Sequence, residues 1–395
     1  MHKQRIPKKV FALASMYGAG EAIGPVVNKL RKLGTRVFLV SSGGATGAFN
    51  KLNVAIDYMV EGKPNEKEYK TLQEKMVDFD PTSILTGTNV QDEQHLLTPD
   101  QFIWYLEREI LKIPTVALLD IWGNYSERFS DLKFPMESNR LEIERAGKLR
   151  CLPTSIAIMD EFAKEQMINE GFNPNVLSIT GNPYFEYVVG LTQEFDDKKI
   201  TMRKKILSKP VFSEFDENGK LVVFISDEIE TNYPTIGFSE KSVLIDFLRS
   251  IEEYSEKETI NAIIRPHPFR PGNAKDAADS FKTKLARKVV HNPTDRIDVN
   301  YYSIEEILYV ADLVVGTFNN PLVTARLLGT PVISFQPELT GNDFQWYTNE
   351  REITTLVKNT AELQLNMYYL MHDLIKQNEI GYVEGATERV IGLLK

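Results

Sequence analysis

The sequence has little cysteine and few histidines, and this scarcity excludes several kinds of site. Cys151 is the only cysteine, so neither an intramolecular disulfide nor a cysteine-built zinc site can form. The histidines at positions 2, 95, 291 and 372 are scattered and show no metal-ligand spacing. We therefore predict no metal and no cofactor. The composition fits a reducing compartment, and we expect the cytoplasm.

Long apolar runs and excess positive charge are absent as well. No apolar stretch approaches the roughly 20 residues that span a bilayer. The sequence therefore predicts no transmembrane segment and leaves peripheral membrane contact open. The formal net charge of -9 argues against nucleic-acid binding, because phosphates require a basic surface. The 395 residues suffice for two domains of ordinary size, and the oligomeric state stays open.

Short β-rich runs alternate with longer helical patterns along the chain. This alternation is typical of βαβ units, in which helices cover both faces of a parallel sheet. Residues 22–33 show one such helix, which has apolar residues at helical spacing and ends at Gly34. The predicted strands are 9–15, 36–41, 82–86, 115–120, 155–159, 176–180, 220–226, 262–265, 288–291, 313–315 and 332–335.

A charged and irregular stretch at 186–220 separates the two series of strands and suits a surface connection. We therefore predict an α/β protein with two Rossmann-like domains, 1–185 and 186–395. The last helix either packs on the second domain or crosses back to the first. We expect the two domains to face each other across a cleft, since open α/β sheets bind ligands at their carboxyl edges.

A glycine-rich loop follows the first predicted strand. Gly18 and Gly20 let the backbone approach a ligand closely, and the helix N-terminus behind them favours negative charge. Glu21 then falls in the first helical turn, where its carboxylate can accept a proton from a substrate hydroxyl. The alternative is that Glu21 only complements the helix dipole.

Ligand-type side chains also follow the predicted strand that ends at Asp120. This aspartate comes after apolar residues and precedes Trp122, Asn124, Tyr125 and Arg128. We identify Asp120 as a second candidate for the catalytic base, and Asn124 as a candidate substrate ligand. The alternative is an aspartate that caps a turn above packed aromatic residues.

Two loops of the second half are suited to phosphate. In Arg265-Pro-His-Pro the prolines stiffen the loop around His267, and Arg265 supplies positive charge. The alternative is a structural His–Pro turn.

The second of these loops lies in the segment 311–335, which reads as strand, glycine turn, helix, glycine stop and strand. Gly316 forms the turn, and Thr317, Asn319 and Asn320 fall at the helix N-terminus, where backbone amides lack partners. An ordinary asparagine N-cap is the alternative there.

These stretches together resemble glycosyltransferases of the GT-B fold, and the hydrolysing UDP-N-acetylglucosamine (UDP-GlcNAc) 2-epimerases that share it. Gly20-Glu21 is similar to the Gly-Glu start of the Kdo transferases, where the glutamate serves as base. Thr180-Gly-Asn-Pro resembles the turn that closes their first domain, which makes Asn182 a candidate substrate ligand. Arg265-Pro-His-Pro resembles their nucleotide loop.

Asn319-Asn-Pro-Leu resembles the segment that holds the sugar of the nucleotide in these enzymes. Two features depart from the pattern. Val323 stands where that segment has its glutamate, and the helix after Asn320 lacks the paired acids of the epimerases.

The resemblance implies a metal-independent glycosyltransferase that moves a sugar from a nucleotide-sugar donor to a hydroxyl of a glycan, lipid or small molecule, in glycan biosynthesis. The alternatives are a hydrolysing epimerase and a sugar-nucleotide-binding protein without turnover. The sequence does not specify the sugar, the nucleotide, the acceptor or the stereochemical course.

Overall fold

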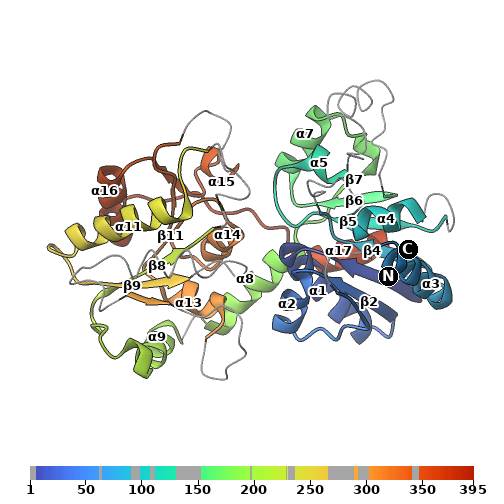
Figure 1. Cartoon of the computed structure of the whole chain (residues 1–395), viewed down its shortest axis with the longest axis horizontal. Helices are drawn as coiled ribbons and strands as arrows, with labels where there is room; N and C mark the ends of the chain where they lie inside the picture. The colour runs from blue at the N-terminus through green and yellow to red at the C-terminus, as the bar shows by residue number, and fades with distance from the viewer. Residues whose placement is uncertain are drawn as a thin grey trace. The chain divides into compact units, whose positions relative to one another are not determined.

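The computed structural model describes residues 6–61, 65–89, 98–106, 112–129, 153–195, 198–227, 229, 236–265, 289–291, 302–339 and 347–395. The chain divides into two compact units. Unit 1 comprises Met1–Tyr187 and Tyr382–Lys395, and unit 2 comprises Val188–Gly381. In Figure 1 the red C-terminal helix α17 therefore lies among the blue N-terminal elements of unit 1.

Unit 1 is built on a seven-stranded parallel sheet in the order β3-β2-β1-β4-β5-β6-β7. Val10–Ala14 of the central strand β1 are fully buried, as expected for a parallel strand covered on both faces. The strands are β1 (Lys9–Ala14), β2 (Arg36–Ser42), β3 (Tyr58–Val60), β4 (Ser83–Thr86), β5 (Thr115–Leu118), β6 (Ser155–Ile158) and β7 (Leu177–Ile179).

Helices cover both faces of this sheet. One face packs its apolar side chains against α1, α2 and α17, and the other packs against α3 and α4. The helices of unit 1 are α1 (Tyr17–Lys32), α2 (Ala45–Lys51), α3 (Glu66–Phe79), α4 (Pro99–Leu106), α5 (Tyr125–Phe129), α7 (Glu161–Asn169), the short 3₁₀ helix η2 (Pro174–Val176) and α17 (Ala386–Leu393). Helix α8 (Pro183–Phe195) carries the chain from unit 1 into unit 2.

The C-terminal helix is fixed to unit 1 by polar contacts at its N-terminus. The carboxylate of Glu186 accepts hydrogen bonds from the amides of Gly385 and Thr387, at 2.6 and 3.0 Å. These amides are among those that have no partner within the helix, and a carboxylate also complements the positive end of its dipole. Arg389 donates to the carbonyl of Thr180 at 2.9 Å, which ties α17 to the loop after β7.

Unit 2 is built on a six-stranded parallel sheet in the order β10-β9-β8-β11-β12-β13. The strands are β8 (Lys220–Ile225), β9 (Ile260–Arg265), β10 (Val289–His291), β11 (Leu313–Gly316), β12 (Val332–Phe335) and β13 (Thr355–Val357). The helices are α9 (Lys199–Leu207), η4 (Pro210–Phe212), α11 (Glu240–Tyr254), α13 (Ile304–Val310), α14 (Asn320–Leu327), α15 (Tyr347–Glu350) and α16 (Thr360–Met371).

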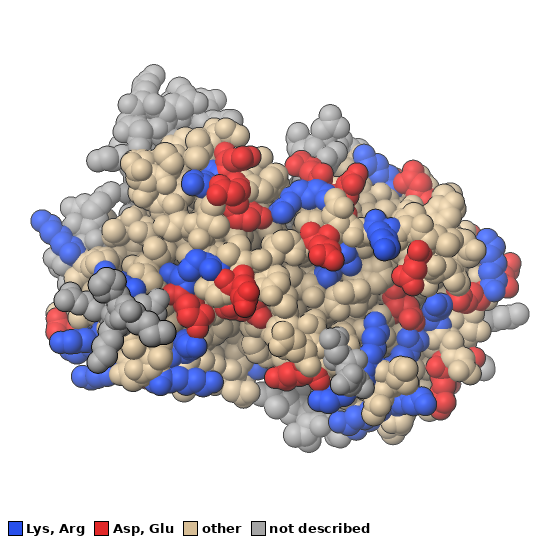
Figure 2. Space-filling model, turned by 180° about the vertical axis from the view of Figure 1, so that it is seen from behind, with Lys and Arg blue, Asp and Glu red and all other residues tan. Residues whose placement is uncertain are grey.

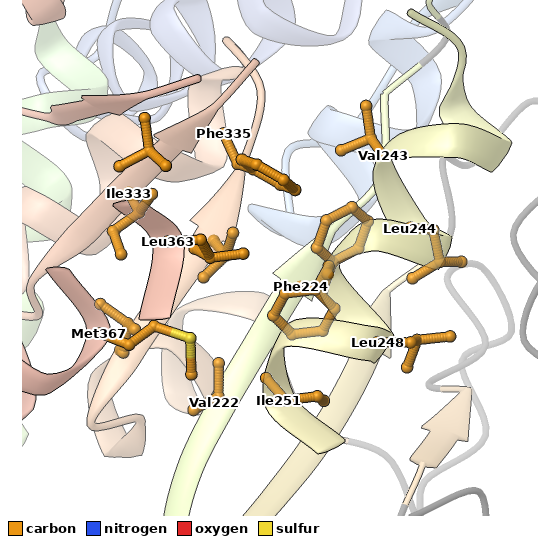
Figure 3. Close-up of a cluster of buried hydrophobic side chains, with 14 of the residues drawn as sticks. Val222, Phe224, Val243, Leu244, Leu248, Ile251, Ile333, Phe335, Leu363 and Met367 are labelled. Atoms are coloured by element: carbon orange, nitrogen blue, oxygen red, sulfur yellow. The ribbon is translucent and has the colours of Figure 1, made fainter. Parts of the chain in front are cut away.

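One core of unit 2 lies between its sheet and the helices α11 and α16. Figure 3 shows Phe224 and Phe335 of the sheet beside Val243 and Leu244 of α11, with Met367 of α16 in the same cluster. Helix α11 contributes apolar residues at helical spacing, so this segment is amphipathic in the sequence. Helices α13 and α14 contact strands of the same sheet.

The α/β class with two Rossmann-like domains is confirmed. Both sheets are wholly parallel, and their central strands follow the order of dinucleotide-binding folds. The pattern missed β3 and β13, which are edge strands of three residues each. Strands this short carry almost no alternation, so only their pairing with β2 and β12 defines them.

Candidate functional site

Both sheets carry ligand-type residues at the same topological position. Strands β1 and β4 are neighbours, but the chain leaves them toward opposite sides of the sheet, and β8 and β11 are arranged in the same way in unit 2. Open parallel sheets bind ligands beyond the carboxyl ends of such strands, at the topological switch point. The loops after these four strands are therefore the candidate positions for a ligand site.

Helix α1 begins at Tyr17, so the expected start at residue 22 is wrong. Gly18 and Gly20 lie inside the helix, because tertiary packing outweighs the low helix propensity of glycine. A Cβ at position 20 would lie 2.8 Å from the Ala48 Cβ, so Gly20 permits the close approach of α2. Glu21 falls in the second turn, which corrects its expected place in the first turn near the end of the dipole.

Glu21 belongs to a buried ion pair at the junction of α1, α2 and α8. The Lys51 Nζ lies 2.7 Å from Glu21 Oε1 and donates to the Tyr184 hydroxyl at 2.8 Å. The same ammonium lies 4.9 Å from the centroid of the Tyr184 ring. Lys51 thus compensates the charge of a carboxylate that is only 8% exposed.

A second buried ion pair holds Asp120. Arg128 Nη1 donates to Asp120 Oδ1 at 2.9 Å and to Thr88 Oγ1 at 2.7 Å. Asn182 Nδ2 donates to the Asp120 carbonyl at 2.9 Å, and Asn182 Oδ1 accepts from the Tyr184 amide at 2.8 Å. The structure therefore links Asp120, Asn182 and, through Tyr184, the Glu21 pair at one edge of the sheet of unit 1.

The other two candidates of unit 1 lie outside this network. Asn124 is exposed, and its φ of 53° is in the left-handed region that asparagine tolerates. Its carbonyl accepts the Arg128 amide at 3.2 Å, so it forms the turn before α5. Gly18 is half-buried in the first turn of α1.

Asp100 is a fully buried carboxyl that the sequence analysis did not single out. Its Oδ2 accepts a hydrogen bond from Ser15 Oγ at 2.8 Å, and its Oδ1 has no hydrogen-bond partner among the described residues. Burial is the main cause that raises the pKa of Asp100 to about 7, whereas the Ser15 hydrogen bond acts in the opposite direction. A carboxyl with this pKa can take up or release a proton near neutral pH.

The local sequence around Asp100 signals only the start of a helix. Thr98 and Gln101 form a reciprocal capping box, with both hydrogen bonds at 3.2 Å. An aspartate in a first turn is ordinary, and most such residues face solvent. Asp100 is buried because α4 packs against β1, which no short window of the sequence reveals.

In unit 2 the loop after β11 is held by neighbouring loops. Asp227, which follows β8, accepts hydrogen bonds from the Thr317 hydroxyl and, at 3.3 Å, from the Phe318 amide. The Thr317 carbonyl accepts from Ser334 Oγ and Gln336 Nε2, which belong to β12 and to the residue after it. Hydrogen bonds therefore hold both the side-chain hydroxyl and the backbone carbonyl of Thr317, one of the residues expected at the nucleotide.

Asn319 has buried polar atoms that nothing satisfies in the described part of the chain. It precedes α14 but makes no side-chain capping bond, so the ordinary N-cap alternative is wrong for it. Its Oδ1 and Nδ2 are both buried without a partner among the described residues. Asn320 is the first residue of the helix, and Gly316 ends β11, where a Cβ would lie 3.1 Å from the Ile225 carbonyl oxygen. All four expected residues thus meet at the N-terminus of α14.

Comparison with known proteins identifies the architecture. No family model and no curated protein matches the sequence. The UDP-GlcNAc 2-epimerase of Methanocaldococcus jannaschii is similar over 98% of this chain and 99% of its own, with 16% identity and a TM-score of 0.66. The UDP-GlcNAc 2-epimerase of Neisseria meningitidis, bound to UDP-GlcNAc, covers the same shares with 16% identity and a TM-score of 0.61.

A glycosyltransferase of Rickettsia africae is similar over 98% of this chain and 93% of its own, with 13% identity and a TM-score of 0.56. The chain has a GT-B-like fold. At these identities the likeness shows the fold alone.

Three further positions in unit 2 were singled out by the sequence pattern. Arg265 ends β9 and is half-buried, next to Ile225 of β8 in the register of the sheet. His267 lies outside the described residues, so its place at the nucleotide stays a prediction. Val323 is buried within α14, so this position offers no carboxylate to a ligand.

The described residues lack two kinds of feature. These residues contain no group of three or more His, Cys, Asp and Glu side chains that could hold a metal ion. They also contain no helix that is long and apolar enough to cross a membrane.

Acidic and basic side chains are interspersed on the face shown in Figure 2, so the net negative charge forms no single patch there.

Proposed function

We propose that this protein is an enzyme that transfers a sugar from a nucleotide-sugar donor to an acceptor hydroxyl. The observation that carries the proposal is the pair of unsatisfied, buried polar atoms of Asn319 at the switch point of unit 2. The similarity over 98% of the chain to a protein bound to UDP-GlcNAc supports the same ligand class.

In this proposal the edge of unit 2 binds the nucleotide. An unpaired buried polar atom costs about 1–3 kcal/mol, which a ligand that hydrogen-bonds to Asn319 recovers. Gly316 lets the chain pass close to the Ile225 carbonyl oxygen, and the N-terminus of α14 with Thr317 and Asn320 favours the negative charge of phosphate. Arg265 and His267 supply the positive charge.

The edge of unit 1 binds the acceptor, with Gly18, Gly20, Asn124 and Asn182 as its candidate ligands. A carboxylate accepts the proton of the acceptor hydroxyl as that oxygen attacks the anomeric carbon. Glu21 and Asp120 are the candidates from the sequence, and each is held by a cation at 2.7 and 2.9 Å respectively. The charge that develops on the leaving phosphate is stabilised by the helix N-terminus and by Arg265. This mechanism requires no metal.

The first test is a binding experiment. Thermal unfolding is followed with UDP-, CMP-, GDP- and dTDP-linked sugars, because a ligand that binds only the native state raises Tm. We expect one class to raise Tm, and Asn319→Ala to weaken its affinity at least tenfold. Asn366→Ala is the matched control, since Asn366 lies on α16 and its side chain donates to the Glu362 carbonyl of the same segment. Absence of a shift with all four classes contradicts the proposal.

The second candidate function is a hydrolysing UDP-GlcNAc 2-epimerase, which the similarity to the Methanocaldococcus and Neisseria enzymes favours. The two functions differ in their need for an acceptor. Incubation with UDP-GlcNAc alone gives free UDP and a sugar inverted at C2 if the protein is an epimerase. A transferase releases UDP rapidly only when an acceptor is added. Tight binding without any product identifies a binding protein without turnover.

A further inference from the structure

We propose that Ser15 and Asp100 form a proton-accepting pair at the edge of unit 1, in which Ser15 contacts the acceptor hydroxyl and Asp100 takes the proton from Ser15. This inference rests on the proposed sugar transfer. It assigns the proton of the acceptor to a different carboxyl from the candidates Glu21 and Asp120.

The position of the pair is the switch point itself. Ser15 is the first residue after β1, and Gly87 is the first residue after β4. A Cβ at position 87 would lie 3.5 Å from Asp100 Oδ1 and 2.5 Å from the Ala19 Cβ. Asp100 is therefore enclosed by the two loops between which a parallel sheet of this order binds its ligand.

The hydrogen bond places Ser15 Oγ where the ionised Asp100 carboxylate can accept its proton. Ser15 Oγ donates to Asp100 Oδ2 at 2.8 Å, so the lone pairs of that hydroxyl oxygen stay available to a second donor. Asp100 Oδ1 has no partner in the described part of the chain. The Ser15 side chain is thus held in one orientation by a group that is itself completely buried.

The electrostatic surroundings separate Asp100 from the other two carboxylates. Glu21 and Asp120 each have a cation at ion-pair distance. Among the described residues Asp100 has no such ion pair. Burial raises the pKa of Asp100 to about 7, the charge of Asp120 adds to this rise, and Arg128 opposes it. A base is most effective when its pKa lies near the working pH.

Atoms and charge balance in this step. The acceptor oxygen forms its bond to the anomeric carbon while its proton passes to Ser15 Oγ, and the Ser15 hydroxyl proton passes to Asp100 Oδ2. The bond between the anomeric carbon and the phosphate oxygen breaks, and its electron pair leaves with the phosphate. Asp100 ends as a neutral carboxylic acid, which returns its proton to solvent after the product leaves. Ser15 touches the substrate, and Asp100 acts through it as a positioning residue.

The test is the pH profile of kcat/KM for release of the nucleotide in the presence of acceptor. The wild type should lose activity below an apparent pKa near 7, because Asp100 must be ionised to accept the proton. Asp100→Asn should lower kcat/KM at pH 8 at least about 100-fold and remove the loss of activity below pH 7, the acid limb of the profile. Ser15→Ala should do the same. A neutral amide is easier to bury than a carboxylate, so Asp100→Asn is expected to fold.

Asp57→Asn is the matched control. Asp57 precedes the edge strand β3 and pairs with Arg31 at 2.7 Å. Asp57→Asn should keep both the wild-type kcat/KM and the acid limb of its pH profile. An unchanged limb in Asp100→Asn overturns the inference and leaves the proposed function intact. Absence of nucleotide release by the wild type overturns the proposed function, and the inference with it.

Discussion

The two units share a strand order, but the edges of their sheets are chemically different. The edge of unit 1 is rich in buried ionisable groups, with the pairs Glu21–Lys51 and Asp120–Arg128 beside Asp100, which has no ion pair among the described residues. The edge of unit 2 is built from hydroxyls and amides, with the carboxylate of Asp227 among them. One fold therefore presents buried ionisable groups in one unit and mainly neutral hydrogen-bonding groups in the other, because the loops vary while the sheet order is kept.

The largest expected effect tests whether unit 1 depends on its charge pairs. Arg128→Ala should lower the free energy of unfolding by about 3–5 kcal/mol, because it leaves the buried Asp120 without its cation. Urea denaturation followed by circular dichroism measures the change. The control is Lys9→Ala, whose partner Asp80 is 86% exposed, and we expect less than about 1 kcal/mol there. Equal effects of the two changes would contradict the importance of the buried pair.

The second prediction concerns the pH dependence that Asp100 gives unit 1. Its pKa is about 7 in the folded state, above its ordinary value of 3.8, so the folded state binds the proton more tightly than the unfolded chain. The contribution of Asp100 to the free energy of unfolding is therefore highest at low pH. It falls as the pH rises from about 4 to about 7 and is constant above pH 7. Relative to the wild type, Asp100→Asn should gain at most about 4 kcal/mol over that range. Parallel stability curves of the two proteins would rule out the titration.

The third prediction tests whether Gly20 of α1 is required for the packing of α1 against α2. Gly20→Ala should cost about 1–3 kcal/mol, because the added methyl group overlaps α2. Gly190→Ala is the matched change in α8, where no atom lies within 4 Å of the added Cβ. It should stabilise the protein by up to about 1 kcal/mol through helix propensity. Thermal unfolding compares the two, and a stabilising Gly20→Ala would contradict the packing role.

The smallest effect concerns the carboxylate in unit 2. Asp227 accepts hydrogen bonds from the Thr317 hydroxyl and the Phe318 amide. Its negative charge repels a phosphate bound nearby. Asp227→Asn keeps an acceptor for Thr317 but removes the charge, so affinity for the nucleotide should rise about fivefold, or about 1 kcal/mol. Titration calorimetry measures it. Asp312→Asn, which alters a carboxylate bonded to Arg203 and the Leu221 amide, should leave the affinity unchanged.

The sequence predicted the fold well because its signals are local. Strands β1 and β8 each contain an uninterrupted apolar run, as expected for parallel strands buried on both faces. The convergence of Gly316, Thr317, Asn319 and Asn320 was also predictable, since consecutive residues between a strand and a helix must lie at the sheet edge. The start of α1 was not predictable, because glycine opposes helix locally and the contact with Ala48 comes from α2.

The amino-acid sequence by itself determined the α/β class and the edge of each sheet at which polar loops gather, because periodicity and turn residues act over a few positions. Only the tertiary structure decided the state of the side chains at those edges. It paired Glu21 with Lys51, paired Asp120 with Arg128, and buried Asp100 beside Ser15. Charge compensation and desolvation depend on neighbours that are distant in the chain, and these neighbours meet only when the sheet and its helices pack.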